Sequence, residues 1–323
     1  RKDEARYAAK VSAEIFAELE GYFGIPYPFE KLDQIAVPRF SGAMENPGLI
    51  TYGQNILLTR PDEETASTRR RYASVGAHEM AHQWFGNLVT MRYWDDIWLN
   101  ESFATWMEER TLERWQPGWD SPGERARSHG GAMRLDGLGS ARAVRQPIES
   151  THDIRNAFDG ITYSKGQALL DMFEHYVGEE RFREGVRGYL RAHSFGNASA
   201  DDFLGALSAA GGAELGPAMR TFLDQPGVPL VTLEARCEAG KARALHLRQA
   251  PYRPLGAEVA AGKGEAPRWQ VPVCVRLRGE RGKEGGAGTC LLLKEAEADL
   301  PLPEGRPCAE AGGLASGNAD AAG

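Results

Sequence analysis

Two histidines four positions apart constrain this chain more than any other feature. His78 and His82 lie in a stretch that reads as a helix, and no glycine or proline interrupts the five residues that they bound. Residues four apart share one face of a helix, so two imidazoles there can bind one ion. Glu79 follows the first histidine, and its carboxylate can lie beside such an ion without binding it. The alternative is a surface helix that carries two histidines by chance.

A third metal ligand is expected from Glu101, nineteen residues after His82. Glu101 lies in the first turn of a predicted helix, where a carboxylate also suits the helix dipole. Taken alone, it would be interpreted as an ordinary acid at the start of a helix. Zinc accepts nitrogen and oxygen donors and keeps one position open for water in catalytic sites. We therefore predict one Zn²⁺ per chain, bound by His78, His82 and Glu101.

Composition excludes several other classes of protein. The chain has 323 residues, of which 42% are apolar and 26% are charged, an ordinary balance for a globular protein. Its net charge of −7 gives no electrostatic footprint for nucleic acid. No apolar run is long enough to span a membrane. The chain begins at Arg1 rather than at methionine, which we interpret as a start inside a longer protein.

The residue patterns predict an α+β chain that is mainly helical before Pro226 and rich in strands after it. Helical spacing of apolar residues predicts helices at 5–20, 65–84, 99–115, 160–177, 179–193, 201–210 and 214–224. Short strands are predicted at 34–37 and 56–59. Later strands are predicted at 228–234, 242–248, 269–277 and 290–294. A glycine-rich loop is expected at 282–286, and a frayed tail at 309–323.

Four ordered motifs now indicate a family. His78–His82 with Glu101 in a Trp-Leu-Asn-Glu context resembles the gluzincin metallopeptidases, specifically the aminopeptidase N family. The segments Gly42–Asn46, Tyr22–Phe29 and Ile161–Gly166 resemble three further motifs of that family. The resemblance runs from residue 22 to residue 166 and continues more weakly to residue 318. Pro47 departs from the family, which usually has tryptophan there.

The resemblance implies a role for each matching residue. Glu79 would act as the general base, and Tyr163 would stabilise the oxyanion. Glu45 would bind the free amine of the substrate and so select an N-terminal residue. The substrate-binding segment would consist of Gly42, Ala43, Met44, Glu45 and Asn46, with the backbone of its first two residues pairing with the peptide. The expected activity is a zinc-dependent aminopeptidase acting on peptides with a free N-terminus.

The resemblance also implies a domain organisation. Residues 1–226 would form a thermolysin-like catalytic domain, 227–312 a small β-sandwich and 313–323 a flexible tail. The family usually adds a β-rich domain before this region and a helical domain after it.

Three other functions remain open on the sequence. A thermolysin-type endopeptidase needs only the zinc ligands and Glu79. A noncatalytic binding scaffold typically loses one of the functional residues, which are all present here. A relative that also opens lipid epoxides has no feature here that singles it out. Asp95 and Asp96 are candidates to orient a zinc-bound imidazole, although helix capping is the commoner role for such residues.

The four cysteines all follow residue 226, and none forms a Cys-x-x-Cys pair. Cys274 and Cys290 flank a connection that resembles a hairpin and could pair, which would leave Cys237 for Cys308. That pairing favours a periplasmic or secreted protein. The alternative is four reduced thiols in a cytosolic protein.

Overall fold

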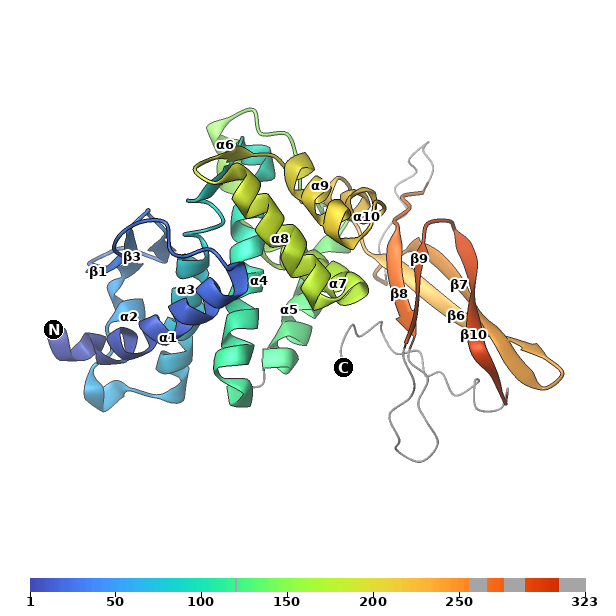
Figure 1. Ribbon diagram of the computed structural model, residues 1–323, viewed down its shortest axis with the longest axis horizontal. Coiled ribbons are helices and arrows are strands. Elements are labelled where there is room, and N and C mark those ends of the chain that lie inside the picture. The colour runs from blue at the N-terminus through green and yellow to red at the C-terminus, as the bar shows by residue number, and fades with distance from the viewer. Residues whose placement is uncertain (120, 256–265, 276–287, 308–323) are drawn as a thin grey trace.

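A computed structural model describes residues 1–119, 121–255, 266–275 and 288–307. Most helices lie in the first two thirds of the chain, and the longest strands lie in the last third (Figure 1). The helices are α1 (Arg6–Phe23), α2 (Gln54–Leu57), α3 (Ala66–Ala81), α4 (Trp98–Trp115), α5 (Ser121–Asp136), α6 (Thr151–Asn156), α7 (Gly166–Val177), α8 (Glu179–His193), α9 (Ala200–Gly211) and α10 (Leu215–Leu223). A single π-helical turn, η5 (Ile161–Lys165), leads directly into α7.

The strands of the described residues form four small sheets. Near the N-terminus, β1 (Asp33–Val37), β3 (Leu49–Gly53) and β2 (Ala43–Met44) lie side by side in that order, with β1 parallel and β2 antiparallel to β3. A two-stranded parallel pair joins β4 (Val89–Met91) to β5 (Gly196–Ala198). The later strands form an antiparallel sheet in the order β10 (Glu297–Pro307), β7 (Lys241–Pro251), β6 (Pro229–Glu238), and an antiparallel pair of β8 (Val271–Val275) with β9 (Thr289–Leu293).

This mixture of helices and strands agrees with the α+β class expected from the sequence. The long helices were predicted to within a few residues, and α8 matches its predicted bounds. The predicted strand at 56–59 is wrong, because α2 covers its first two residues and the ladder partner of β1 is instead β3. Helix α1 runs past Gly21 and ends at Phe23, where it is capped by Gly24, whose φ of 60° is left-handed. Helices α5 and α6 and strands β2, β3, β4, β5 and β10 were not predicted.

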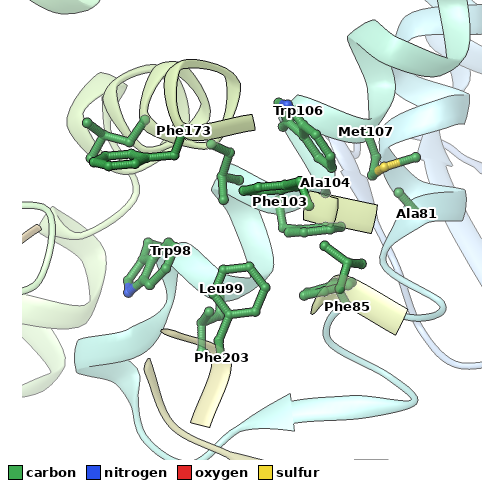
Figure 2. Close-up of a cluster of buried hydrophobic side chains, with 14 of the residues drawn as sticks. Ala81, Phe85, Trp98, Leu99, Phe103, Ala104, Trp106, Met107, Phe173 and Phe203 are labelled. Atoms are coloured by element: carbon green, nitrogen blue, oxygen red, sulfur yellow. The ribbon is translucent and has the colours of Figure 1, made fainter. Parts of the chain in front are cut away.

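Aromatic packing joins helices α3 and α4, which carry the predicted metal ligands. Figure 2 shows Phe85, just after α3, close to Phe103 of α4, with Phe203 of α9 and Phe173 of α7 around them. All four of these side chains are at most 1% exposed. Because apolar burial contributes about 25 cal/mol per Å², rings of this size are a large share of the energy that holds the helices together.

The start of α7 is pressed against α4. A Cβ atom added to Gly166 would lie 1.9 Å from Ser102 Oγ, so only glycine fits without movement. The same hydroxyl donates a hydrogen bond to the carbonyl of Thr162, at 2.5 Å. Ser102 follows Glu101 directly, so this contact fixes the π-helical turn that carries Tyr163 beside the predicted metal ligand.

A buried ion pair lies where the helices give way to the strands. Lys165 Nζ lies 2.9 Å from Asp136 Oδ2, and both side chains are at most 6% exposed. Lys165 also donates to the carbonyl of Gln225, and Asp136 accepts the N–H of Gly227. Burial lowers the pKa of Lys165, although the charge of Asp136 opposes this shift. The pair ties η5 and α5 to the segment that precedes β6.

The structure confirms the first predicted cysteine pairing. A disulfide joins Cys274 of β8 to Cys290 of β9, which lie directly opposite each other in the ladder. The second predicted pair includes Cys308, which lies outside the described residues, as do the predicted loop at 282–286 and the tail at 309–323. Among the described residues, no helix is both long enough and apolar enough to cross a membrane.

Candidate active site

The three predicted metal ligands converge between α3 and α4. His78 lies on the last turn of α3, His82 is the residue that caps it, and Glu101 lies in the first turn of α4. Glu101 Oε2 lies 3.5 Å from His78 Nε2 and 3.6 Å from His82 Nε2. The imidazole rings are nearly perpendicular, at 83°, with their centroids 4.7 Å apart.

This donor set fits a zinc ion. Ligands about 2.1 Å from a tetrahedral ion lie about 3.4 Å from one another, close to the spacing of these nitrogen and oxygen atoms. The surroundings also favour positive charge at this point. Burial lowers the pKa of His78, but its hydrogen bonds to Glu101 and Glu108, together with the charges of Glu108 and Glu79, outweigh burial and raise the pKa to about 10. A set of one carboxylate and two imidazoles leaves a fourth position for water or substrate.

Each histidine has a partner for its other ring nitrogen. His78 Nδ1 lies 3.4 Å from Glu108 Oε2. His82 Nδ1 lies 2.8 Å from Asn100 Oδ1 and 3.1 Å from the carbonyl of Phe85. Such acceptors place the proton on Nδ1 and leave Nε2 free to bind a metal ion.

Glu79 lies beside the three metal donors but is not one of them. Its side chain is 6% exposed, and Oε2 has no hydrogen-bond partner among the described residues. Burial raises the pKa of Glu79 to about 8, opposed by the charge of His78 and reinforced by the charges of Glu45, Glu101 and Glu108. A cation at the adjacent donors would lower this pKa again. A buried carboxyl group of this kind is suited to accept and return a proton.

Tyr163 reaches the site from the π-helical turn η5. Its ring stacks beside His78 with the centroids 6.1 Å apart. Burial raises the pKa of Tyr163, and the charge of Glu101 together with a hydrogen bond to it raises the pKa further. The phenol therefore stays protonated at neutral pH and can donate a hydrogen bond. Turns of π-helix occur frequently at functional sites.

The segment Gly42–Asn46 forms the edge of the N-terminal sheet beside the metal donors. Ala43 and Met44 make up β2, the edge strand, and Gly42 precedes it with a φ of 81°, a conformation that favours glycine. Glu45 points inward, because Oε1 lies 3.9 Å from His82 Nδ1. Asn46 stays exposed, and its carbonyl accepts the N–H of Leu49 to close the turn.

Glu45 is held by three amide side chains. Gln83 and Asn87 both donate to its main-chain carbonyl, at 3.2 and 2.7 Å. Asn100 Nδ2 donates to its carboxylate, at 2.9 Å from Oε1. Donor atoms of Glu45, Glu79 and His82 also lie within 4.8 Å of one another. The carboxylate is therefore fixed directly beside the metal-ligand triad.

Sequence reasoning missed two residues that contact the candidate site, Glu108 and Asn100. Glu108 lies seven residues after Glu101, two turns along the same face of α4, so helical periodicity could have indicated it. Asn100 precedes Glu101 in the chain, but no sequence pattern shows where its amide points. Neither Asp95 nor Asp96 contacts an imidazole, because both pair with Arg145.

A cavity of about 410 Å³, lined mainly by serine, arginine and glutamate residues, adjoins the site at Glu108. The α3 residues that line this cavity all precede His78 in the chain. The residues that hold Glu45, in contrast, all follow His78. The lining consists of Ser67, Arg70, Arg71 and Ser74 of α3, Glu108, Glu109 and Leu112 of α4, and Glu124 of α5. Ser74 also donates a short hydrogen bond to Glu108.

One further group of possible metal ligands lies on α7, away from this site. Donor atoms of Asp171, Glu174 and His175 lie within 4.8 Å of one another. Arg125 already pairs with Asp171, and Arg110 with Glu174. The two guanidinium groups already balance the negative charge of these carboxylates, so this cluster is a poor candidate for a metal site.

The comparison with protein families agrees with this geometry. The peptidase family M1 domain matches residues 7–222 of this chain, and this range includes every candidate site residue. The chain belongs to peptidase family M1. This confirms the family resemblance expected from the sequence motifs, and it places the chain among the metallopeptidases.

Curated relatives of the chain carry aminopeptidase names. A probable aminopeptidase 1 of Saccharolobus solfataricus is 38% identical over 301 residues, which cover 93% of this chain and 36% of the relative. The mitochondrial aminopeptidase 2 of Saccharomyces cerevisiae is 41% identical over 303 residues, which cover 93% and 30%. The glutamyl aminopeptidase of Bos taurus is 40% identical over 236 residues, which cover 72% and 25%. The chain spans about a third or less of the length of these relatives.

Proposed function

We propose that this chain carries the catalytic core of a zinc-dependent aminopeptidase that removes the N-terminal residue from peptides. One zinc ion per chain would be held by His78, His82 and Glu101. When bound, zinc supplies Lewis-acid polarisation of a carbonyl and activation of water at neutral pH. Family membership and the converging donor atoms support this proposal.

In the proposed reaction, Glu79 handles the protons. Its buried carboxylate accepts a proton from the water that attacks the scissile carbonyl, and a new carbon–oxygen bond forms. Glu79 then returns the proton to the departing nitrogen as the carbon–nitrogen bond breaks, so one water is consumed per peptide bond. Its position directly after His78 and its otherwise unpartnered oxygen support this role.

Tyr163 would stabilise the negative charge that develops on the carbonyl oxygen. Its protonated hydroxyl donates a hydrogen bond to that oxygen, while the ring stays positioned against His78. Loss of one such donor typically reduces the rate about 10²–10³-fold. The edge strand β2, with Gly42, Ala43 and Met44, would pair with the extended substrate, and the turn at Asn46 would hold that strand in place.

The observation that carries the aminopeptidase proposal is the position of Glu45. Its carboxylate lies 3.9 Å from an imidazole of the donor triad and is only 14% exposed. A substrate ammonium group paired with this carboxylate would bring the first peptide bond to the metal. An internal stretch of peptide has no such charge and would continue into the space that Glu45 fills.

We also propose the domain division expected from the sequence, with a catalytic unit at 1–226 and a β-sandwich at 227–312. The change from helices to strands after Leu223 supports the first boundary. The described strands that follow residue 226, β6 to β10, are consistent with a structural role, since they contain none of the candidate site residues.

The proposal is tested by hydrolysis of a panel of amino-acid 4-nitroanilides. We expect wild type to cleave them, Glu79→Gln to be inactive although it binds zinc, and Tyr163→Phe to be strongly impaired. Glu45→Ala should raise KM for the free-amine substrates, and wild type should not cleave their N-acetylated forms. An active Glu79→Gln variant, or zinc-loaded wild type without any hydrolysis, would contradict the proposal for this chain.

A further inference from the structure

We infer that Asn100 is a positioning residue for substrate amine recognition, holding the Glu45 carboxylate in register with the metal ligand His82. This inference rests on the proposed function of Glu45. The amide of Asn100 lies between the two groups, only 7% exposed. Its oxygen faces His82 Nδ1 at 2.8 Å, and its nitrogen faces Glu45 Oε1 at 2.9 Å.

The chemistry of an amide makes this bridge directional. A side-chain amide has one acceptor end and one donor end. An imidazole that binds metal through Nε2 carries its proton on Nδ1, so it requires an acceptor, and Asn100 Oδ1 supplies one. The NH₂ group must then face Glu45 and, at 3.3 Å, Glu101 Oε1. The orientation that satisfies the histidine is therefore the orientation that donates to the recognition carboxylate.

Glu45 needs such a donor to stay in place. Its carboxylate lies near that of Glu79, and the Asn100 amide that contacts it also contacts Glu101, so like charges favour movement of Glu45 away toward water. The contacts given above for the Glu45 carboxylate involve its Oε1 atom, so its Oε2 atom remains for a substrate ammonium group. Asn100 thus fixes one oxygen and leaves the other for recognition.

The backbone at Gly86 leaves room for the Asn100 amide. A Cβ atom added to Gly86 would lie 2.1 Å from Asn100 Oδ1, and Gly86 has a φ of 124°. Gly86 therefore supplies the space that the amide occupies. The metal ligand does not depend on Asn100 alone, because the carbonyl of Phe85 also accepts from His82 Nδ1. Removal of the amide should consequently affect Glu45 more than the metal.

The test compares ligand selectivity with zinc affinity. The two probes are leucine hydroxamate, which has a free amine, and N-acetylleucine hydroxamate, which has none. Their dissociation constants are measured by calorimetry on the zinc-loaded chain, and zinc affinity is measured separately by chelator competition. Wild type, Asn100→Ala, Glu45→Ala and the double variant form a thermodynamic cycle. Asn87→Ala is the matched control, since it removes an amide that contacts only the main-chain carbonyl of Glu45.

We expect Asn100→Ala to reduce the preference for the free-amine probe about tenfold or more, the usual effect of losing a hydrogen bond to a charged group. Zinc affinity should change much less. Asn100→Ala should add nothing to the loss already caused by Glu45→Ala, and Asn87→Ala should leave most of the preference intact. If Asn100→Ala does not fold, Asn100→Ser carries the same measurement.

Two results would overturn the inference while leaving the proposed function of Glu45 intact. In the first, Asn100→Ala keeps the full preference for the free amine while Glu45→Ala loses it, so amine recognition does not need the bridge. In the second, zinc affinity falls as much as amine selectivity, which would make Asn100 a metal-site residue only. If Glu45→Ala itself retains the preference, the proposed function of Glu45 has failed, and the inference fails with it.

Discussion

Glu108→Ala should weaken zinc binding more than any other change outside the donor triad. Glu108 approaches His78 Nδ1 to 3.4 Å, and no other acceptor for that nitrogen is present among the described residues. His82 Nδ1, in contrast, has two acceptors, at 2.8 and 3.1 Å. Removal of Glu108 therefore leaves one imidazole without orientation, whereas truncation of Asn100 leaves the Phe85 carbonyl in place.

The size of this effect follows from the partners of metal-bound histidines. Loss of such a partner typically reduces metal affinity about 10–100-fold. We expect Glu108→Ala to fall in the upper part of this range, because it also removes a negative charge that favours a cation at His78. Glu108→Gln keeps an acceptor oxygen but not the charge, so its loss should be intermediate.

The assay is competition for zinc against a chromophoric chelator, with thermal unfolding as a check on folding. Glu113→Ala is the control, because Glu113 lies further along α4 and pairs with Arg125 instead. Equal zinc affinity in Glu108→Ala and wild type would refute the reasoning. An equal loss in Glu108→Ala and Glu113→Ala would mean that α4 had been disturbed as a whole.

Three further predictions concern stability, each measured by chemical denaturation. Burial raises the pKa of Glu109 from 4.5 to about 7. Glu109 therefore destabilises the folded chain progressively as pH rises from 4.5 to 7 and above. Glu109→Gln should consequently stabilise the chain at about pH 8 but not at about pH 4. Lys165→Met should cost about 3–5 kcal/mol by leaving Asp136 buried and unpaired, and Asp136→Leu added to it should recover part of the loss. Gly166→Ala should destabilise by about 1–3 kcal/mol through overpacking, whereas Gly188→Ala, which meets no neighbouring atom, should stabilise by about 0.5–1 kcal/mol.

Part of the candidate site could be predicted from the sequence because its residues are close together in the chain. His78, Glu79 and His82 depend only on the spacing of residues within one helix. The position of Glu101 in a second helix required the additional expectation that the two helices pack together. The amide bridge at Asn100 was beyond such reasoning, since it depends on the meeting of Glu45, His82 and α4 in space.

The missed elements share a dependence on distant contacts. The apolar run at 56–59 reads equally as strand or helix, because short runs carry no decisive period. In the structure, the strand that pairs with β1 is β3 and not the segment at 56–59. Helix α5 contains glycines and few apolar residues, so its pattern is weak. Strand β10 contains three prolines and is specified by its pairing with β7.

The most direct test of the central claim is mass spectrometry of a single unlabelled peptide, incubated with the zinc-loaded chain in free-amine and N-acetylated forms. The account predicts stepwise loss of one residue at a time from the free N-terminus and no cleavage of the acetylated peptide. Cleavage of both forms at the same internal bond would contradict it and would identify an endopeptidase, since the carboxylate of Glu45 would then play no part in selecting the bond.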